Sequence, residues 1–178
     1  MSVRRRLVID TSVLRSAGGE NAVHPTSAHC RAVLFAILQI CHKATVSAEL
    51  RAEWDKHQSK YATQWRSAMR KKGKLIETKL TEKTGLRNKV LQVHQQAPTK
   101  QEAALKDFHL VEAAIEADWI VISLDDTVRQ IFAEACEIGD KLSEVVWVHP
   151  DDGDILTWLE DGAMPQQHKR LFAYISES

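Results

Sequence analysis

Acidic residues stand just after two of the short apolar runs in this chain. Asp10 directly follows the run Leu7–Ile9, and Asp125 and Asp126 follow the run Ile120–Ser123. If the runs are parallel strands, their carboxyl ends meet at the edge of the sheet where such sheets bind ligands. An aspartate that begins a turn or caps a helix explains either position taken alone. Taken together, the positions predict a cluster of carboxylates at one edge of a sheet.

A third acid, Asp107, lies inside a segment with the periodicity of a helix. Asp107 shares one stripe of that helix with Val111 and Ala114, while His109 and Glu112 share another face. A carboxylate on the core-facing stripe costs several kcal/mol to bury unless something compensates its charge. A metal ion is one such compensator, and an arginine partner is the structural alternative.

A fourth acid follows the weaker apolar run that ends at Val46–Ser47. Glu49 and Glu53 both satisfy this position, and the spacing does not choose between them. Several carboxylates in one crevice repel one another, so the cluster needs a hard cation to bridge it. Ligation by oxygen alone suits Mg²⁺ or Mn²⁺ rather than zinc, whose usual Cys and His ligands are not clustered in this sequence. Of the eight histidines, His109 is the one near the predicted acids.

The elements that would position these acids alternate between strands and helices. Strands are expected at Leu7–Ile9, Ala44–Val46, Trp119–Ile122 and Val145–Val148. Helices are expected around Ala32–Ile40 (with Thr26 or Ser27 as N-cap), along the stripe Leu50, Trp54, Tyr61 and Trp65 of one long helix, and at Leu86–His94, Gln101–Ala117, Thr127–Ile138 and Asp154–Leu159. Continuous β-branched runs are typical of strands covered on both faces. We therefore predict an α/β fold, an α/β/α sandwich around a central parallel sheet of about four to five strands.

Length and charge indicate one domain with an uneven charge distribution. The 178 residues suit a single domain over 1–178, with a basic helical insertion at 60–100 and a C-terminal strand and helical extension at 145–178. Residues 51–100 carry 13 Lys or Arg and 4 Asp or Glu, whereas residues 101–178 carry 5 and 17. This layout predicts a polyanion-binding surface beside a cation-binding site, and solvated charged faces are the alternative.

Several protein classes are disfavoured by what the sequence lacks. No apolar run approaches the roughly 20 residues of a membrane-spanning helix, and the N-terminus has no signal-peptide core. Three widely spaced cysteines, an odd number, indicate reduced thiols in a cytoplasmic protein. The phosphate-binding motifs GxxxxGK(S/T) and GxGxxG and the nucleophile motif GxSxG are absent. A receiver domain needs paired acids after its first strand and a dehalogenase-like phosphatase needs Asp-x-Asp there, but this chain has Asp10-Thr11-Ser12.

Four segments together resemble the PIN-domain family of small metal-dependent nucleases, which are often toxins of toxin–antitoxin pairs. The matching segments are, in order, Leu7–Ser12, Val46–Ser47 with Glu53 six residues after the serine, Asp107–Ala114 and Val121–Asp125. The interval of 18 residues between Asp107 and Asp125 agrees with the spacing of the third and fourth acids in that family. The resemblance covers about residues 3–16, 44–56 and 105–133, less than half of the chain.

The resemblance implies a role for each matching residue. Asp10, Glu53, Asp107 and Asp125 would be the catalytic and metal-binding acids, Asp126 would be a further candidate ligand, and Ser12 and Ser123 would hydrogen-bond an acid or the substrate. The implied reaction is hydrolysis of RNA phosphodiester bonds, in which carboxylate-bound Mg²⁺ or Mn²⁺ activates a water molecule.

The resemblance also implies partners. The basic stretch over 51–89, which includes Arg51, Lys56 and Lys60, would follow the phosphate backbone of RNA. Tyr61 or Trp65 would stack on a base, unless their helical spacing marks a packed face instead. An antitoxin-like protein and a homodimer are further implied partners. The alternative function is a PIN-like binding or regulatory module with weak or no nuclease activity, which works through such a partner.

Overall fold

Five parallel strands form the centre of the computed structural model, which describes residues 3–19 and 21–175. Residues 1–2, 20 and 176–178 of the predicted domain lie outside the described residues. The strands are β1 (Arg6–Ile9), β2 (Lys43–Val46), β3 (Leu75–Glu77), β4 (Ile120–Ile122) and β5 (Val146–Val148). They are ordered β3-β2-β1-β4-β5, and the four strand pairings are parallel. The predicted α/β fold with a central parallel sheet is confirmed.

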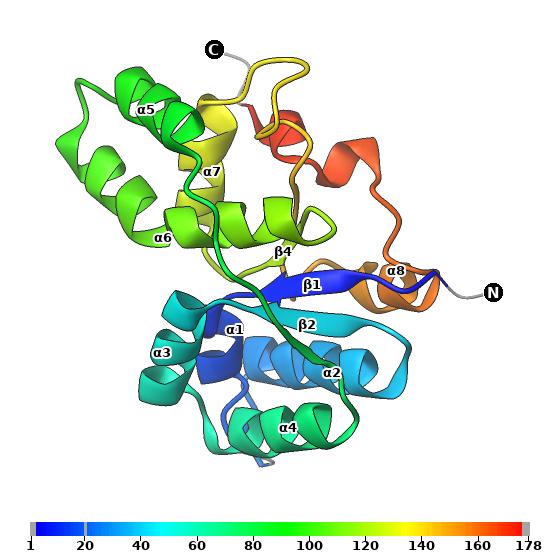
Figure 1. Cartoon of the computed structure of the whole chain (residues 1–178). Helices are drawn as coiled ribbons and strands as arrows, with labels where there is room; N and C mark the ends of the chain where they lie inside the picture. Colours follow the sequence, from blue (N-terminus) through cyan, green and yellow to red (C-terminus); the bar gives the residue numbers. More distant parts are fainter. Residues whose placement is uncertain (1–2, 20, 176–178) are drawn as a thin grey trace.

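Helices cover both faces of the sheet (Figure 1). One face carries α1 (Thr11–Ser16), α2 (Pro25–Gln39), α3 (Ala48–His57), α4 (Lys60–Lys71) and α8 (Ile155–Glu160). The other carries α5 (Thr84–Val93), α6 (Pro98–Glu116), α7 (Asp126–Glu134) and the 3₁₀ turn η2 (Leu171–Tyr174), which follows η1 (Gln167–Lys169). Helical crossovers of this kind are what parallel strands require as connections. Among the described residues, no helix combines the length and the apolar character needed to span a lipid bilayer.

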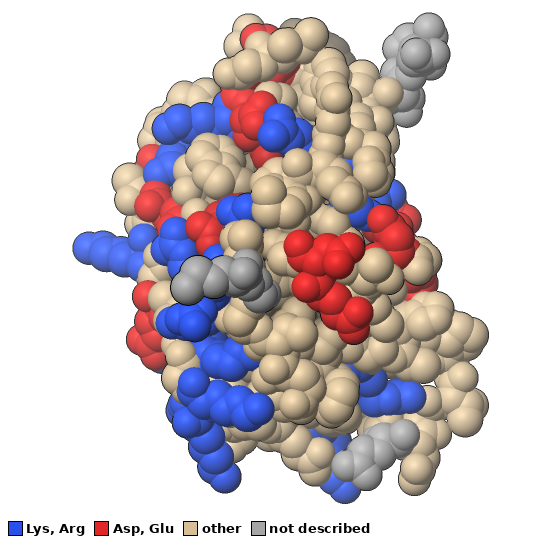
Figure 2. All heavy atoms as spheres, turned by 90° about the vertical axis from the view of Figure 1, so that its right-hand side faces the viewer, with Lys and Arg blue, Asp and Glu red and all other residues tan. Residues whose placement is uncertain are grey.

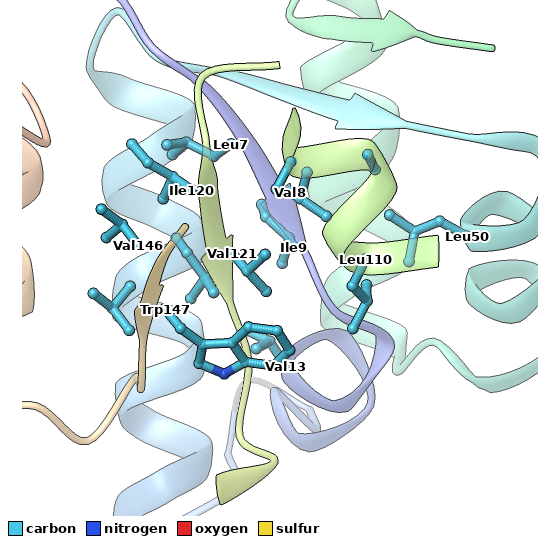
Figure 3. Packing of buried hydrophobic residues seen from close by; sticks show 14 of the residues in the cluster. Leu7, Val8, Ile9, Val13, Leu50, Leu110, Ile120, Val121, Val146 and Trp147 are labelled. Carbon is cyan, nitrogen blue, oxygen red and sulfur yellow. The ribbon is translucent and has the colours of Figure 1, made fainter. Parts of the chain in front are cut away.

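The two central strands are buried on both faces, as their unbroken apolar sequences predicted. Leu7–Ile9 of β1 and Ile120–Ile122 of β4 have no exposed surface. Figure 3 shows these strands packed with Trp147 of β5 and Leu110 of α6 in one cluster. Each fully buried large apolar side chain stabilises the fold by about 1.5–3 kcal/mol. The core therefore fixes where the loops at the carboxyl ends of β1 and β4 begin.

The long helix predicted through residues 50–65 is two helices. α3 ends before Ser59, and the hydroxyl of Ser59 accepts a 3.2 Å hydrogen bond from the backbone N–H of Ala62, which caps the start of α4. The apolar stripe continues across this break because Trp54 and Trp65 meet edge to face, with ring centroids 6.2 Å apart. The prediction was wrong because the apolar residues of two successive helices that face the same core have nearly the spacing of one long helix, so the spacing does not reveal the break at Ser59.

Two other element boundaries differ from the prediction. α2 begins at Pro25 with His24 as its N-cap, instead of being capped by Thr26 or Ser27. Proline suits this first helical position because its φ is fixed and its missing N–H would have no partner there. Trp119 lies outside β4, because its φ of 67° places it in the left-handed region, which a strand does not contain.

The segment 60–100 contributes to the sheet as well as to the helical layers. Its residues Leu75–Glu77 form β3, which pairs with β2 at one edge of the sheet. α4 packs against α2 on one face, and α5 packs against α6 on the other. The prediction of a helical insertion was incomplete, because a strand of three residues between charged neighbours has too little periodicity to be recognised.

The C-terminal extension includes β5 and α8, and then lies along the outer edge of β5. Arg170 forms an antiparallel bridge with Val146, and the backbone N–H of Leu171 donates a 2.8 Å hydrogen bond to the carbonyl oxygen of Val145. The turn η2 follows and packs against α7. The outer edge of β5 is therefore already hydrogen-bonded by the chain itself.

Candidate functional site

The carboxyl ends of β1 and β4 lie where the order of the strands reverses. From β1 the chain proceeds to β2 and β3 on one side and then returns to β4 on the other side. Connections that depart from neighbouring strands to opposite faces leave a crevice between the strand ends. The backbone N–H of Asp10 donates a 2.9 Å hydrogen bond to the carbonyl oxygen of Ile122, so these two strand ends are in direct contact.

Asp10 is held in place by both of the predicted serines. It is 8% exposed, and its Oδ2 accepts hydrogen bonds from the hydroxyls of Ser12, at 2.5 Å, and Ser123, at 2.7 Å. Ser12 in turn accepts from the backbone N–H of Leu124, and Ser123 accepts from that of Asp125. These bonds join the ends of β1 and β4 and fix Oδ2 of Asp10, while Oδ1 bonds to neither serine.

Asp125 and Asp126 differ in what they contact. Oδ1 of Asp125 accepts a 2.8 Å hydrogen bond from the backbone N–H of Val128 and caps α7. Asp126 instead forms an ion pair with Arg129 at 2.8 Å, and its side chain is 63% exposed. The geometry therefore favours Asp125 as the acid of the crevice, because the charge of Asp126 already has a surface partner.

Asp107, on α6, lies within reach of the charges of two other predicted acids. Burial is the main reason that the pKa of Asp107 rises from 3.8 to about 6, the charge of Asp10 raises it further, and Asp125 adds a smaller increase. Lys106 and His109 act in the opposite direction. In the described part of the chain, Asp107 forms no ion pair with Lys or Arg, so the arginine partner considered as an alternative is not present.

Glu53 lies beside this cluster, at the same end of β1. Its Oε2 accepts a 3.1 Å hydrogen bond from the hydroxyl of Thr11, the residue after Asp10, and lies 3.6 Å from Nε2 of His109. Glu49 is exposed one turn earlier on α3. The contact with Thr11 favours Glu53 over Glu49 as the fourth acid of the candidate site.

Two polar residues of α6 line the neighbouring surface, and neither received a role from the sequence. His109 is 8% exposed, its Nδ1 lies 3.1 Å from the carbonyl oxygen of Lys106, and its buried Nε2 has no hydrogen-bond partner. Glu112 is 4% exposed and pairs with Arg87 at 3.2 Å. Together with Glu53 these residues line a cavity of about 510 Å³. In the sequence, the helix face that His109 and Glu112 share was the one indication that they lie together beside the acids.

The three predicted phosphate-binding cations are in different environments. Arg51 forms an ion pair with Glu77, so its charge is already compensated. Lys56 and Lys60 are exposed, and within the described residues they form no ion pair. Lys60 lines a separate hollow of about 280 Å³ at the start of α4.

The aromatic residues of α4 belong to the core rather than to a stacking surface. Trp65 is 2% exposed, and its Nε1 donates a 2.6 Å hydrogen bond to the carbonyl oxygen of Leu34. Tyr61 is half-buried and packs against the same core. The prediction that Trp65 stacks on a base is therefore wrong, because a nucleotide cannot reach its ring.

The carboxylate oxygens of the candidate site are the type of ligand that a hard cation prefers, although the side chains are not close enough together to bind one. Asp10, Asp107 and Asp125 offer oxygen atoms alone, which is the preference of Mg²⁺ and Mn²⁺. Among the described residues, no group of three or more His, Cys, Asp or Glu side chains is close enough to hold a metal ion. Burial raises the pKa of Asp107, and the charges of Asp10 and Asp125 raise it further, so repulsion between these carboxylates disfavours a closer approach. A divalent cation would remove that repulsion, so the oxygen atoms that these residues offer suit such an ion by their chemistry.

Comparison with known proteins gives no family assignment. No protein-family model matches the chain. A search of curated proteins likewise finds no match. The resemblance to PIN domains therefore stays a prediction that depends on the residues described above.

Proposed function

We propose that this protein is a metal-dependent phosphodiesterase that acts on RNA. The observation that carries the proposal is the group Asp10, Asp107 and Asp125 beside the reversal point of the sheet, which has no Lys or Arg ion pair within residues 3–19 and 21–175. Bringing like charges together in a partly buried place is unfavourable. Groups with perturbed pKa values in such a place are candidates for a functional site.

Four acids would hold Mg²⁺ or Mn²⁺ in this proposal: Asp10, Glu53, Asp107 and Asp125. Once bound, such an ion supplies an activated water and stabilises negative charge on the phosphate. The contribution of the protein is positioning. Serine hydroxyls hold Asp10, the hydroxyl of Thr11 holds Glu53, and the backbone at the start of α7 holds Asp125.

Cleavage of a labelled single-stranded RNA in the presence of Mn²⁺ tests the proposal. Asp10→Asn keeps the shape of the side chain and removes its charge, so we expect cleavage to fall by about a hundredfold or more, as for the loss of one electrostatic transition-state contact. Asp161→Asn, at an exposed position after α8, is the matched control and should cleave as the wild type does. Equal cleavage by the wild type and Asp10→Asn would show a contaminating nuclease and contradict the proposal.

A second candidate is a PIN-like binding module that works through an antitoxin-like protein. The observations that favour it are the segment 60–100, which adds α4, β3 and α5, and the C-terminal extension that lies along β5. Such a module would gain thermal stability from Mn²⁺, as any ligand of the native state provides, but it would not cleave RNA. Co-purification with a small protein partner would support this candidate over the nuclease.

A homodimer and a cytoplasmic location are parts of the same proposals. Burial raises the pKa of the Cys30 and Cys136 thiols to about 12, so both stay protonated and poorly reactive, which suits a reducing compartment. Light scattering on the purified protein would measure the oligomeric state, and a monomeric mass would contradict the dimer.

A further inference from the structure

Cations gather at the amino ends of three adjacent strands. Arg4 and Arg5 precede β1, Lys43 begins β2, and Lys72 and Lys74 precede β3. Backbone hydrogen bonds place these segments side by side: the N–H of Lys43 donates to the carbonyl oxygen of Arg5 at 2.8 Å, and the N–H of Ala44 in β2 donates to the carbonyl oxygen of Lys74 at 2.9 Å. Because the strands are parallel, this basic edge lies opposite the edge that carries Asp10.

The cations of this edge differ from most other cations of the chain in having no acidic partner. Arg4, Lys43 and Lys72 form no ion pair within the described residues, and Arg4 and Lys72 are exposed. Elsewhere in the basic stretch several cations are paired with acids: Arg51 with Glu77, Arg66 with Asp55, Lys83 with Glu116, Arg87 with Glu112, and Lys89 with Glu137 and Asp140. Lys56, Lys60, Arg70 and Lys79 form no ion pair among the described residues. Arg4, Lys43 and Lys72, at the amino ends of β1, β2 and β3, thus have no acidic partner among the described residues, whereas Arg6, the first residue of β1, pairs with Asp118.

The cations surround a hollow in the surface. Arg4, Lys43, Lys72 and Lys74 line a cavity of about 350 Å³ together with the end of α2. Lys74 is the structural member of this group, since its Nζ donates hydrogen bonds to carbonyl oxygens of the last turn of α2, including that of Leu38 at 3.0 Å. Burial lowers the pKa of Lys74, and the charges of Lys72 and Arg4 lower it further, which shows that these cations repel one another. An anion in the hollow would relieve that repulsion.

We propose that the hollow at the amino ends of β1, β2 and β3 binds the phosphate backbone of single-stranded RNA, as a surface separate from the acidic crevice. Figure 2 looks at this side of the molecule: Lys and Arg cover much of the left of the view, with some Asp and Glu among them, and another group of Asp and Glu lies right of centre. The four residues of β1 separate the two edges by about 13 Å at roughly 3.3 Å per residue. Binding at this surface requires neither a metal ion nor catalysis.

The composition of the hollow favours a phosphate backbone over a protein partner. Four of its nine lining residues are Lys or Arg, and no Asp or Glu is among them. The core of a protein interface is depleted in charge and enriched in aromatic residues, which this hollow lacks. The apolar lining residues Leu38 and Ile40 are half-buried against the core of the protein itself. Flexible cations without aromatic neighbours suit sequence-independent contacts with phosphates.

Salt-dependent binding of a fluorescein-labelled polyuridine tests the inference. Fluorescence anisotropy is measured with the full chain in EDTA, which separates binding from metal-dependent cleavage, and the RNA is checked for integrity on a gel. The edge variant is Arg4→Gln, Lys43→Gln and Lys72→Gln combined; it spares Lys74, which holds α2. The matched control is Arg15→Gln, Lys79→Gln and Lys141→Gln combined, three exposed cations without ion pairs among the described residues.

The two variants lose the same net charge, so a difference between them reports a site. The slope of log K against log salt is about −0.7 for each phosphate neutralised on a single strand, so the edge variant should lose about 2 units of slope. The control should lose less than half of that. Equal losses in both variants, or an edge variant that binds like the wild type, would overturn the inference. Loss of binding to a polyglutamate peptide with unchanged RNA binding would also overturn it, in favour of an acidic protein partner.

Discussion

Replacing Asp107 with asparagine should stabilise the folded protein at neutral pH, although the change removes a proposed metal ligand. Asparagine keeps the shape of the side chain and removes a negative charge that burial, and then the charges of Asp10 and Asp125, disfavour. The rise in the pKa from 3.8 to about 6 corresponds to about 3 kcal/mol in favour of the neutral form. Because Asp107 is only partly buried, solvent screening reduces this value, and we expect a gain of about 1–2 kcal/mol.

The gain depends on pH in a defined direction. The carboxyl of Asp107 ionises near 3.8 in the unfolded chain and near 6 in the folded protein. Between these values the unfolded chain binds fewer protons, so this residue makes the wild type less stable as the pH rises from about 4 to about 6. The variant lacks that loss. Its advantage over the wild type should be small near pH 4 and complete above about pH 7.

Urea unfolding followed by tryptophan fluorescence at the two ends of this pH range measures the effect. Asp161→Asn, at an exposed position, serves as the control and should leave the free energy of unfolding unchanged at both pH values. Added Mn²⁺ should raise the melting temperature of the wild type more than that of Asp107→Asn, because the bound ion would balance the negative charge of Asp107, which the variant lacks. A variant that is destabilised equally at both pH values would refute the argument that burial and the neighbouring carboxylates raise this pKa.

Three further substitutions test other contacts of the structure. Ser123→Ala removes one of the two hydroxyls that hold Asp10 and should lower both the free energy of unfolding, by about 1–2 kcal/mol, and the rate of RNA cleavage; a rate equal to that of the wild type would contradict the positioning role. Trp65→Ala should lower the free energy of unfolding in urea by about 3–5 kcal/mol, because its indole is buried, and a stable variant with weakened RNA binding would instead favour base stacking. Arg87→Ala leaves a buried carboxylate without its ion pair and should cost about 3 kcal/mol in the same measurement, most of which Glu112→Gln in the same chain should restore. If the double variant is as unstable as Arg87→Ala, the ion pair is not what stabilises this part of α6.

The parts of the fold that the sequence predicted are those where local pattern and burial agree. The runs Leu7–Ile9 and Ile120–Ile122 are unbroken and β-branched because both faces of those strands are covered. The edge strand Leu75–Glu77 was missed because its side chains are half-buried or exposed, which gives no apolar pattern. It forms a strand by pairing with β2, which is distant in the sequence. The break at Ser59 was missed because a serine also occurs inside helices, so it indicates an N-cap only where other evidence shows that the preceding helix ends.

The candidate site was predictable where one residue follows a strand directly, and less so where it depends on packing between helices. Asp10 and Ser123 stand at strand ends, so the parallel sheet alone brings them together. The choice of Glu53 over Glu49 depends on how α3 is oriented against α1, which no spacing in the sequence encodes. His109 was left without a role for the same reason, because its closeness to Glu53 arises from the packing of α3 against α6.

The two outer edges of the sheet have different consequences for assembly. On the β5 side, Arg170 and Leu171 already occupy backbone groups of Val145 and Val146, so a strand from a second molecule would have to displace the chain's own C-terminal segment. On the β3 side, the strand is three residues long and ends at the charged residue Glu77, so an added strand would gain few hydrogen bonds. Growth of the sheet into an intermolecular aggregate is therefore disfavoured at both edges. The chain's own C-terminal segment occupies the edge of β5, and β3 is too short to offer many hydrogen bonds.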